Sequence, residues 1–111
     1  MTTINLTVTP HSATDTPPFQ WLHIHITAPT GLIEADALKG LTLPDGINWR
    51  QGVVIEGKAP IWLYGYLVHE CHPAAWVACY DPRLGAVVAA THSAKVTVGT
   101  VFDVQSPCES A

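Results

Sequence analysis

Charged residues are scarce in this chain: only 13% of its 111 residues are Asp, Glu, Lys or Arg, and five are Lys or Arg. The formal net charge is −4, whereas a protein that coats long nucleic acid through many phosphates is normally basic. The composition therefore argues against general DNA or RNA coating and is compatible with a small anionic ligand held by a few donors. So low a charge also suggests that some surface is buried against further copies of the chain.

Cysteine is also rare, with three residues and no C-x-x-C pair. We expect Cys71, Cys79 and Cys108 to be reduced thiols of a cytoplasmic protein. No apolar run is long enough for a membrane span, and the first residues lack the basic and then apolar pattern of a signal peptide. A hydrophobic content of 48% predicts a single domain over residues 1–111, with one core.

Alternation of apolar and polar residues predicts strands at 4–9 and 21–27 in the first part of the chain. A loop rich in proline and threonine separates them at 10–19. Residues 32–40 predict a short helix that ends at Gly40.

The second half predicts a βαβ unit. A short strand between glycines at 52–57, an apolar helix at 60–72 and a buried strand at 76–80 follow one another closely. Such strands are parallel, with a right-handed crossover. Residues 81–85 predict a turn, and 86–93 predict a strand that returns antiparallel. Residues 96–104 predict a further strand or hairpin, and 105–111 a flexible tail.

Polar residues gather at one end of this unit. The loop 57–60, with Lys58, follows the first strand and opens the helix, while Asp81 and Arg83 follow the second strand. The carboxyl ends of parallel strands share an edge, and a helix begins with a positive dipole end, so this edge is expected to bind an anion. Taken singly, Asp81 is also a good turn-former before proline, and Arg83 reads equally well as a solvated surface residue.

Histidines gather at the other end. His69 and His72 are three residues apart in the last turn of the predicted helix. That helix runs antiparallel to its strands and spans about 20 Å, so its histidines lie opposite the anion-binding edge. If 81–85 is a hairpin turn, His92 and Ser93 return to the histidine edge as well. A favourable interaction with the helix dipole also explains such histidines.

Two interpretations of the histidines as metal ligands have less support from the sequence. Zinc at Cys71 with the neighbouring histidines lacks a second ligand pair at suitable spacing. His23 and His25 alternate with apolar residues, so we expect them on the exposed face of a strand rather than as a metal pair.

Residues 52–93 contain, in order, G-V-V-I, a glycine with a basic residue, P-I-W-L, paired histidines, Y-D-P-R-L-G-A-V-V and His-Ser. In this run, about two-fifths of the chain, the sequence resembles the small CRISPR-associated ring nucleases called Csx-three or Crn-three. The loop 10–19 looks like an insertion relative to compact members of that family.

The resemblance implies an α/β fold: a small Rossmann-like domain related to CRISPR-associated Rossmann-fold sensor domains, with a central mixed sheet and two helices. It implies a cytoplasmic homodimer that binds cyclic tetra-adenylate, the second messenger of type III CRISPR systems, rather than DNA or a membrane. Members cut this ring to linear di-adenylate with Mn²⁺ and so switch off antiviral signalling. The alternatives are a sensor that does not cleave, and a Mn²⁺-dependent exonuclease acting on the 3′ ends of short adenylate RNA.

Carried over to this sequence, the resemblance makes His72, Asp81 and Arg83 catalytic, with Asp81 as the Mn²⁺ ligand. The residues expected to bind the substrate are Gly57, Lys58, Ala59, Pro60, His69, His92 and Ser93. Because the two edges face apart, we expect two dimers to stack head to tail around the ring. One dimer then grips the ring with its anion-binding edge, and the other brings His72.

Overall fold

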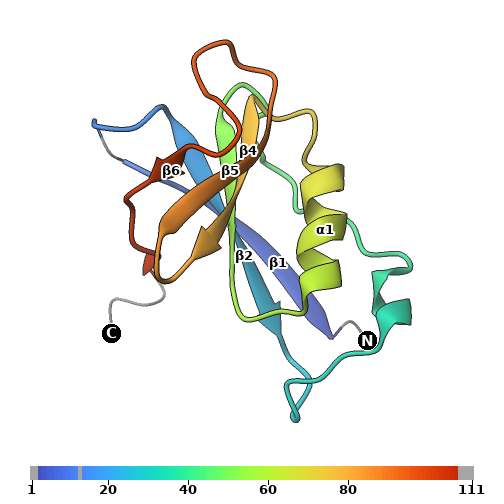
Figure 1. Cartoon of the computed structure of the whole chain (residues 1–111). Helices are drawn as coiled ribbons and strands as arrows, with labels where there is room; N and C mark the ends of the chain where they lie inside the picture. The colour runs from blue at the N-terminus through green and yellow to red at the C-terminus, as the bar shows by residue number, and fades with distance from the viewer. Residues whose placement is uncertain (1–2, 13, 108–111) are drawn as a thin grey trace.

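The computed structural model describes residues 3–12 and 14–107 and has an α/β fold with one six-stranded mixed sheet (Figure 1). The strands lie side by side in sequence order, from β1 to β6. Their bounds are β1 Ile4–Pro10, β2 Phe19–Ile26, β3 Gly52–Glu56, β4 Trp76–Asp81, β5 Gly85–Thr91 and β6 Val101–Phe102. Strands β2, β3 and β4 are parallel to one another, and the remaining pairs are antiparallel.

The predicted βαβ unit is present as β3, helix α1 (Ile61–Glu70) and β4. Both of its strands are nearly continuous apolar runs because they lie inside the sheet and are covered on both faces. Alternate residues of β3 serve different faces: Val53 and Ile55 pack with Leu63 and Leu67 of α1, whereas Val54 packs on the opposite side.

The second face of the sheet has an aromatic core. Phe19 packs edge-on against both Trp21 and Trp76 there. Val96 and Phe102, which follow β5 in the chain, cover this cluster. The last part of the chain therefore covers this face of the sheet, and α1 covers the other (Figure 1).

One expected helix is not an α-helix. Residues 32–40 contain only a four-residue 3-10 helix, Ala35–Leu38, none of whose residues is buried. Nucleating a short helix is costly, and most helical stability in proteins comes from burying an apolar face. Within the described part of the chain there is therefore one α-helix rather than two, and the crossover from β2 to β3 is mostly irregular.

Several further boundaries differ from expectation. Helix α1 ends at Glu70, so His72 lies in the turn after it. The expected strand 96–104 is reduced to Val101–Phe102, because the residues before it form a turn in which the Thr100 N–H donates to the Thr97 carbonyl. Pro10 and Phe19 belong to strands, which shortens the loop 10–19.

The expected flexible tail 105–111 is packed at its start. Ser106 is fully buried, and residues 108–111, with Cys108, lie outside the described part of the chain. Among the described residues, no helix combines the length and the apolar character needed to cross a bilayer.

Candidate functional site

A cleft of about 1210 Å³ opens at the carboxyl ends of β2, β3 and β4. The loop after β3 contributes Gly57, Lys58 and Ala59 to it, and the end of β4 contributes Asp81. The two pieces that the sequence assigned to one edge therefore meet in one cleft. Arg83 lies beside it, in the wall of an adjoining smaller pocket of about 270 Å³.

The loop 57–60 is held in a fixed shape. Gly57 has a φ of 133°, and a Cβ placed on it would lie 2.5 Å from the Ile24 carbonyl oxygen, so only glycine fits. The Tyr64 hydroxyl donates a 2.6 Å hydrogen bond to the Gly57 carbonyl. Burial, followed by the nearby Cys79 and Glu56, raises the pKa of Tyr64 to about 12, which keeps this hydroxyl protonated as a donor.

One wall of the cleft, at the start of α1, can attract an anion, while the carboxylates of Glu56 and Asp81 also line the cleft. Helix α1 begins at Ile61 with no acidic residue in its first turn, so the positive end of its dipole is not neutralised by its own side chains. Lys58 is exposed beside it, and within residues 3–12 and 14–107 no carboxylate forms an ion pair with this lysine.

Asp81 and Arg83 form a tight turn. Asp81 Oδ1 accepts the Arg83 backbone N–H at 2.8 Å, and the Arg83 Nε lies 3.6 Å from the same oxygen. The backbone hydrogen bond from Arg83, more than its charge, lowers the pKa of Asp81, so the carboxylate is ionised. The Arg83 side chain is 87% exposed and remains accessible to a ligand. Asp81 thus forms a turn, and Arg83 is a solvated surface residue, as the simpler interpretations of these two residues predict.

The histidines form a second group. The ring centroids of His69 and His72 are 6.2 Å apart, and those of His72 and His92 are also 6.2 Å apart. All three side chains are exposed. A backbone hydrogen bond of 2.9 Å from His92 to Ala75 fixes β5 next to this turn, and Ser93 follows directly.

The two groups are far apart in one chain. Strand β4, six residues long, lies between the turn that holds His72 and the turn that starts at Asp81. A strand rises by about 3.3 Å per residue, which separates the groups by about 20 Å. Figure 1 shows the same arrangement: the start of α1 and the β4–β5 turn lie at one end of the sheet, and the end of α1 lies at the other.

A single chain does not supply a manganese site. The described residues contain no group of three His, Cys, Asp or Glu side chains that could hold a metal ion. The described residues therefore offer no complete three-ligand manganese site within one chain, and no reaction step is assigned to Mn²⁺.

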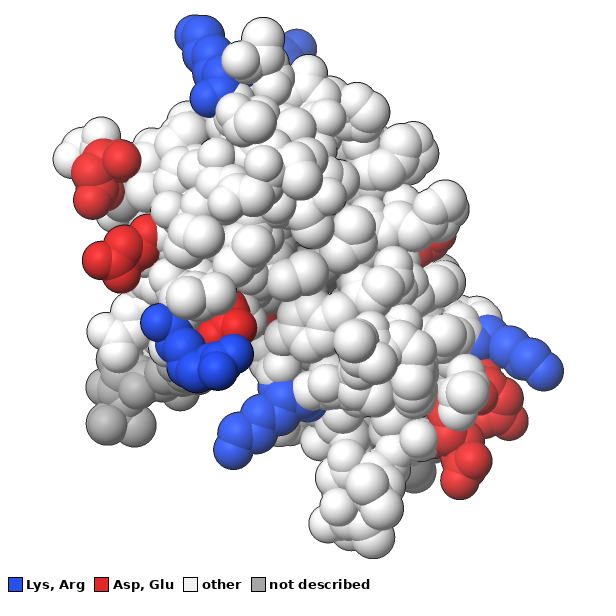
Figure 2. All heavy atoms as spheres, viewed as in Figure 1, with Lys and Arg blue, Asp and Glu red and all other residues white. Residues whose placement is uncertain are grey.

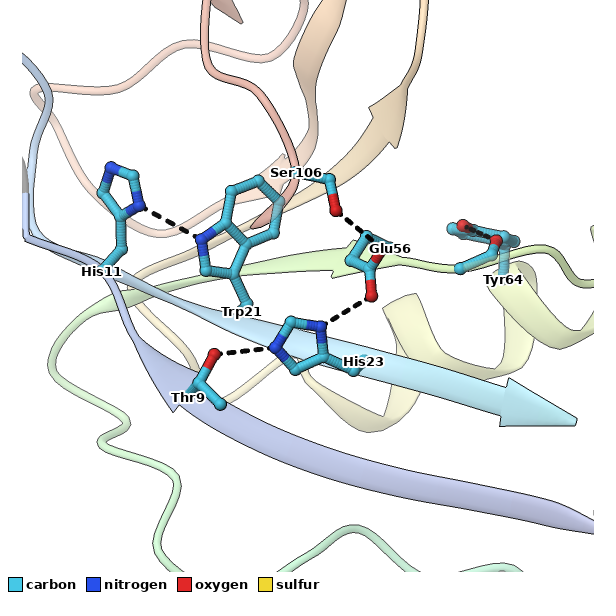
Figure 3. A network of polar contacts seen from close by, with 8 residues as sticks. Thr9, His11, Trp21, His23, Glu56, Tyr64 and Ser106 are labelled. Carbon is cyan, nitrogen blue, oxygen red and sulfur yellow. Dashed lines mark hydrogen bonds and ion pairs between the residues drawn. The ribbon is translucent and has the colours of Figure 1, made fainter. Parts of the chain in front are cut away.

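A buried polar network behind the cleft was not predicted (Figure 3). Glu56 is 5% exposed; His23 Nδ1 lies 2.6 Å from one of its oxygens, and the Ser106 hydroxyl donates to the other at 2.9 Å. His23 Nε2 is in turn 2.7 Å from Thr9 Oγ1. The expectation that His23 is exposed is wrong: its side chain is 13% exposed, because it bonds Glu56 and stacks on Trp21. The sequence feature that could have indicated this network is Glu56, an acidic residue at the end of an otherwise apolar strand.

This network is a structural wall of the cleft. It joins β1, β2, β3 and the segment around Ser106, and both oxygens of Glu56 are occupied. His25, two residues further along β2, is exposed as predicted and lines the cleft.

The comparison with known proteins bears on this geometry. A family model described as CRISPR-associated protein (Cas_csx3) matches residues 26–103. The chain belongs to this family. The resemblance seen in 52–93 is thereby confirmed, and every predicted site residue of this Cas_csx3 protein lies within the match. The loop 10–19 lies outside it.

One relative is an uncharacterized protein of Aquifex aeolicus (strain VF5), 42% identical over 69 residues, which are 59% of this chain and 62% of the relative. The chain thus spans less than two-thirds of that relative's length. Family membership makes this Cas_csx3 protein CRISPR-associated, without itself naming a ligand or a reaction.

Proposed function

We propose that this Cas_csx3 protein is a ring nuclease, a cytoplasmic homodimer that binds cyclic tetra-adenylate and cleaves it to linear di-adenylate, so that type III CRISPR signalling is switched off. The observation that carries the proposal is the division of its polar residues between an anion-binding cleft and a distant histidine group. A phosphodiesterase needs both charge stabilisation and proton transfer. Neither group alone supplies both, but the two groups together do.

The cleft suits a phosphate ring. Lys58, Arg83 and the start of α1 offer positive potential, and a ring with four phosphates repeats the same contact by symmetry. Few cations are then needed per chain, which reconciles anion binding with a net charge of −4.

The cleavage chemistry requires no protein nucleophile. The ribose 2′-oxygen bonds to the adjacent phosphorus while the bond from phosphorus to the 5′-oxygen breaks. The 2′ proton passes to a base, and the leaving 5′-oxygen takes a proton from an acid. Each cut leaves a 2′,3′-cyclic phosphate and a 5′-hydroxyl, and two cuts on opposite sides of the ring give two di-adenylates.

His72 is proposed to transfer protons in this reaction, because an imidazole exchanges protons readily near neutral pH. Arg83, positioned by Asp81 in the turn, stabilises the charge on the phosphorus oxygens. His69, His92 and Ser93 surround His72 and hold the substrate.

A separation of about 20 Å means that His72 and Arg83 of one chain do not act on the same phosphate. We therefore propose that the ring lies between two dimers stacked head to tail, each giving one group to a shared site. To test this, His72→Ala and Asp81→Ala proteins, each inactive alone, are mixed. Mixing is expected to restore part of the activity, and no recovery at any ratio rejects the shared site.

A sensor that does not cleave is the second candidate. It is favoured by the separation of about 20 Å between His72 and Arg83 in one chain, which leaves the cleft able to hold the ring without His72 beside it. Cyclic and linear adenylates are incubated with the protein, with Mn²⁺ or with a chelator, and the products are identified. The ring nuclease yields di-adenylate, a sensor leaves the ring intact, and a 3′-exonuclease shortens linear RNA in preference to the ring.

A further inference from the structure

Two large aliphatic side chains stand in solvent at the rim of the cleft. Ile61, the first residue of α1, is 86% exposed, and Leu84, in the β4–β5 turn, is 54% exposed. They belong to different elements, yet both line the cleft. Removing such side chains from water is favourable, so their exposure leaves a sizeable apolar surface available to a ligand.

The position of Ile61 is unusual for a helix start. The first turn of a helix favours Asp or Glu, which interact well with the dipole, but α1 has no acidic residue there. The helix start therefore offers a positive end and an apolar side chain together. Lys58 lies in the same cleft wall, which adds a cation for a phosphate.

The rest of the cleft is mostly apolar. Tyr80 and Val87 line it between the two walls, and the Tyr80 ring packs edge-on against Trp21 with centroids 5.8 Å apart, which fixes its orientation. Figure 2 shows a broad uncharged area in the upper and middle part of this face, with basic and acidic residues grouped in its lower part and at its edges. A flat apolar group with a phosphate attached matches this combination.

We propose that Ile61 and Leu84 are specificity-determining residues that pack against an adenine base of the ring, while Lys58 contacts the neighbouring phosphate. This inference rests on the proposed function. A purine presents a larger flat surface than a pyrimidine and buries more of both side chains, so the pair favours adenylate over uridylate rings.

The test compares the affinity of wild-type protein, Ile61→Ser and Leu84→Ser for cyclic tetra-adenylate and cyclic tetra-uridylate. Each serine variant is expected to bind the adenylate ring about 10-fold more weakly and to lose most of the preference over uridylate. Val98→Ser is the matched control, because Val98 is 59% exposed and does not line the cleft. Unchanged thermal unfolding confirms that the variants fold.

Three results contradict the proposal. Wild-type protein that binds the adenylate ring while both serine variants keep full affinity overturns the base contact but leaves the ring nuclease standing. Wild-type protein that does not bind the ring overturns both. Variants that weaken both rings equally and also dissociate the ligand-free assembly in light scattering assign Ile61 and Leu84 to an interface between copies instead.

Discussion

Glu56 shows how one buried carboxylate organises this protein. It ends a strand whose other residues are all apolar or glycine, and it accepts hydrogen bonds from the Ser106 hydroxyl and His23. Burying a charged group is tolerated only where hydrogen bonds replace its water. The residue therefore ties the sheet to the segment around Ser106, directly behind the proposed ligand cleft.

Replacing Glu56 with Gln is expected to lower the free energy of unfolding by about 1–3 kcal/mol. The amide keeps the shape but offers one acceptor where the carboxylate offers two, and it lacks the charge. Urea denaturation measures the loss. Glu34→Gln is the control, since Glu34 is exposed, and equal stability of the two variants contradicts the role of the network.

Gly57 gives a second prediction at this scale. Gly57→Ala puts a Cβ 2.5 Å from the Ile24 carbonyl oxygen, so the backbone of the loop has to move. Gly46→Ala is the control, because Gly46 also has a positive φ, of 92°, but has no atom within 4 Å of the added Cβ. The control loses about 1–2 kcal/mol of stability from backbone strain. Gly57→Ala is expected to lose more and also to bind cyclic tetra-adenylate more weakly, and equal losses reject the close contact.

Helix α1 positions the cleft as well as covering the sheet. Leu63 and Leu67 are fully buried against the core, whereas Tyr64 turns toward the loop after β3 and binds its carbonyl. The irregular segment 32–40 contains no side chain that is completely buried in the way Leu63 and Leu67 are. An element with an apolar face to bury forms a full helix, and one without it does not.

Tyr64→Phe is expected to cost about 0.5–1.5 kcal/mol of stability, because the hydrogen bond to the Gly57 carbonyl is lost. It also changes the pH dependence. The folded pKa of about 12 exceeds the ordinary value of 10.0, so the folded state holds this proton more tightly and stability falls as pH rises from 10 toward 12.

Unfolding is therefore measured at pH 8 and at pH 11. The wild-type protein should lose more stability than Tyr64→Phe between these values, while Tyr66→Phe, whose hydroxyl bonds the Leu41 carbonyl instead, should behave like wild type. An identical alkaline loss in the Tyr64 variant contradicts the assignment.

At the scale of the whole molecule, the separation of the cleft from the histidine group makes assembly part of the proposed activity. If two dimers share each site, the rate per chain falls when the protein is diluted below the dissociation constant of the pair. A site within one dimer gives a rate per chain that does not depend on concentration.

A second experiment tests the same prediction by adding an excess of an inactive variant to the wild-type protein. His72→Ala protein added to a fixed, low concentration of wild-type protein still provides the anion-binding cleft. It is expected to raise the rate by supplying clefts that pair with the histidine groups of wild-type dimers, whereas a protein carrying both His72→Ala and Asp81→Ala supplies neither group and should not raise it. No response to either addition contradicts sharing.

Much of the architecture could be predicted because its signals are local. Apolar runs bounded by glycine and proline predicted β3, α1 and β4, and the short connection Asp81–Gly85 predicted the antiparallel return of β5. From these the positions of Lys58, Asp81 and His72 at opposite ends of the unit followed, since strand and helix directions fix them. The family assignment also came from this run of residues.

The sequence by itself therefore determined the βαβ unit, the family and the two separate polar groups, because period, turn chemistry and connection length are properties of neighbouring residues. Only the tertiary structure decided that His23 is covered and bonded to Glu56, that 32–40 does not become an α-helix, and that Ile61 and Leu84 face one cleft. These outcomes depend on what packs against a residue from distant parts of the chain: the contact of Glu56 with His23, the partial rather than complete burial of apolar residues in 32–40, and the approach of the β4–β5 turn to the start of α1.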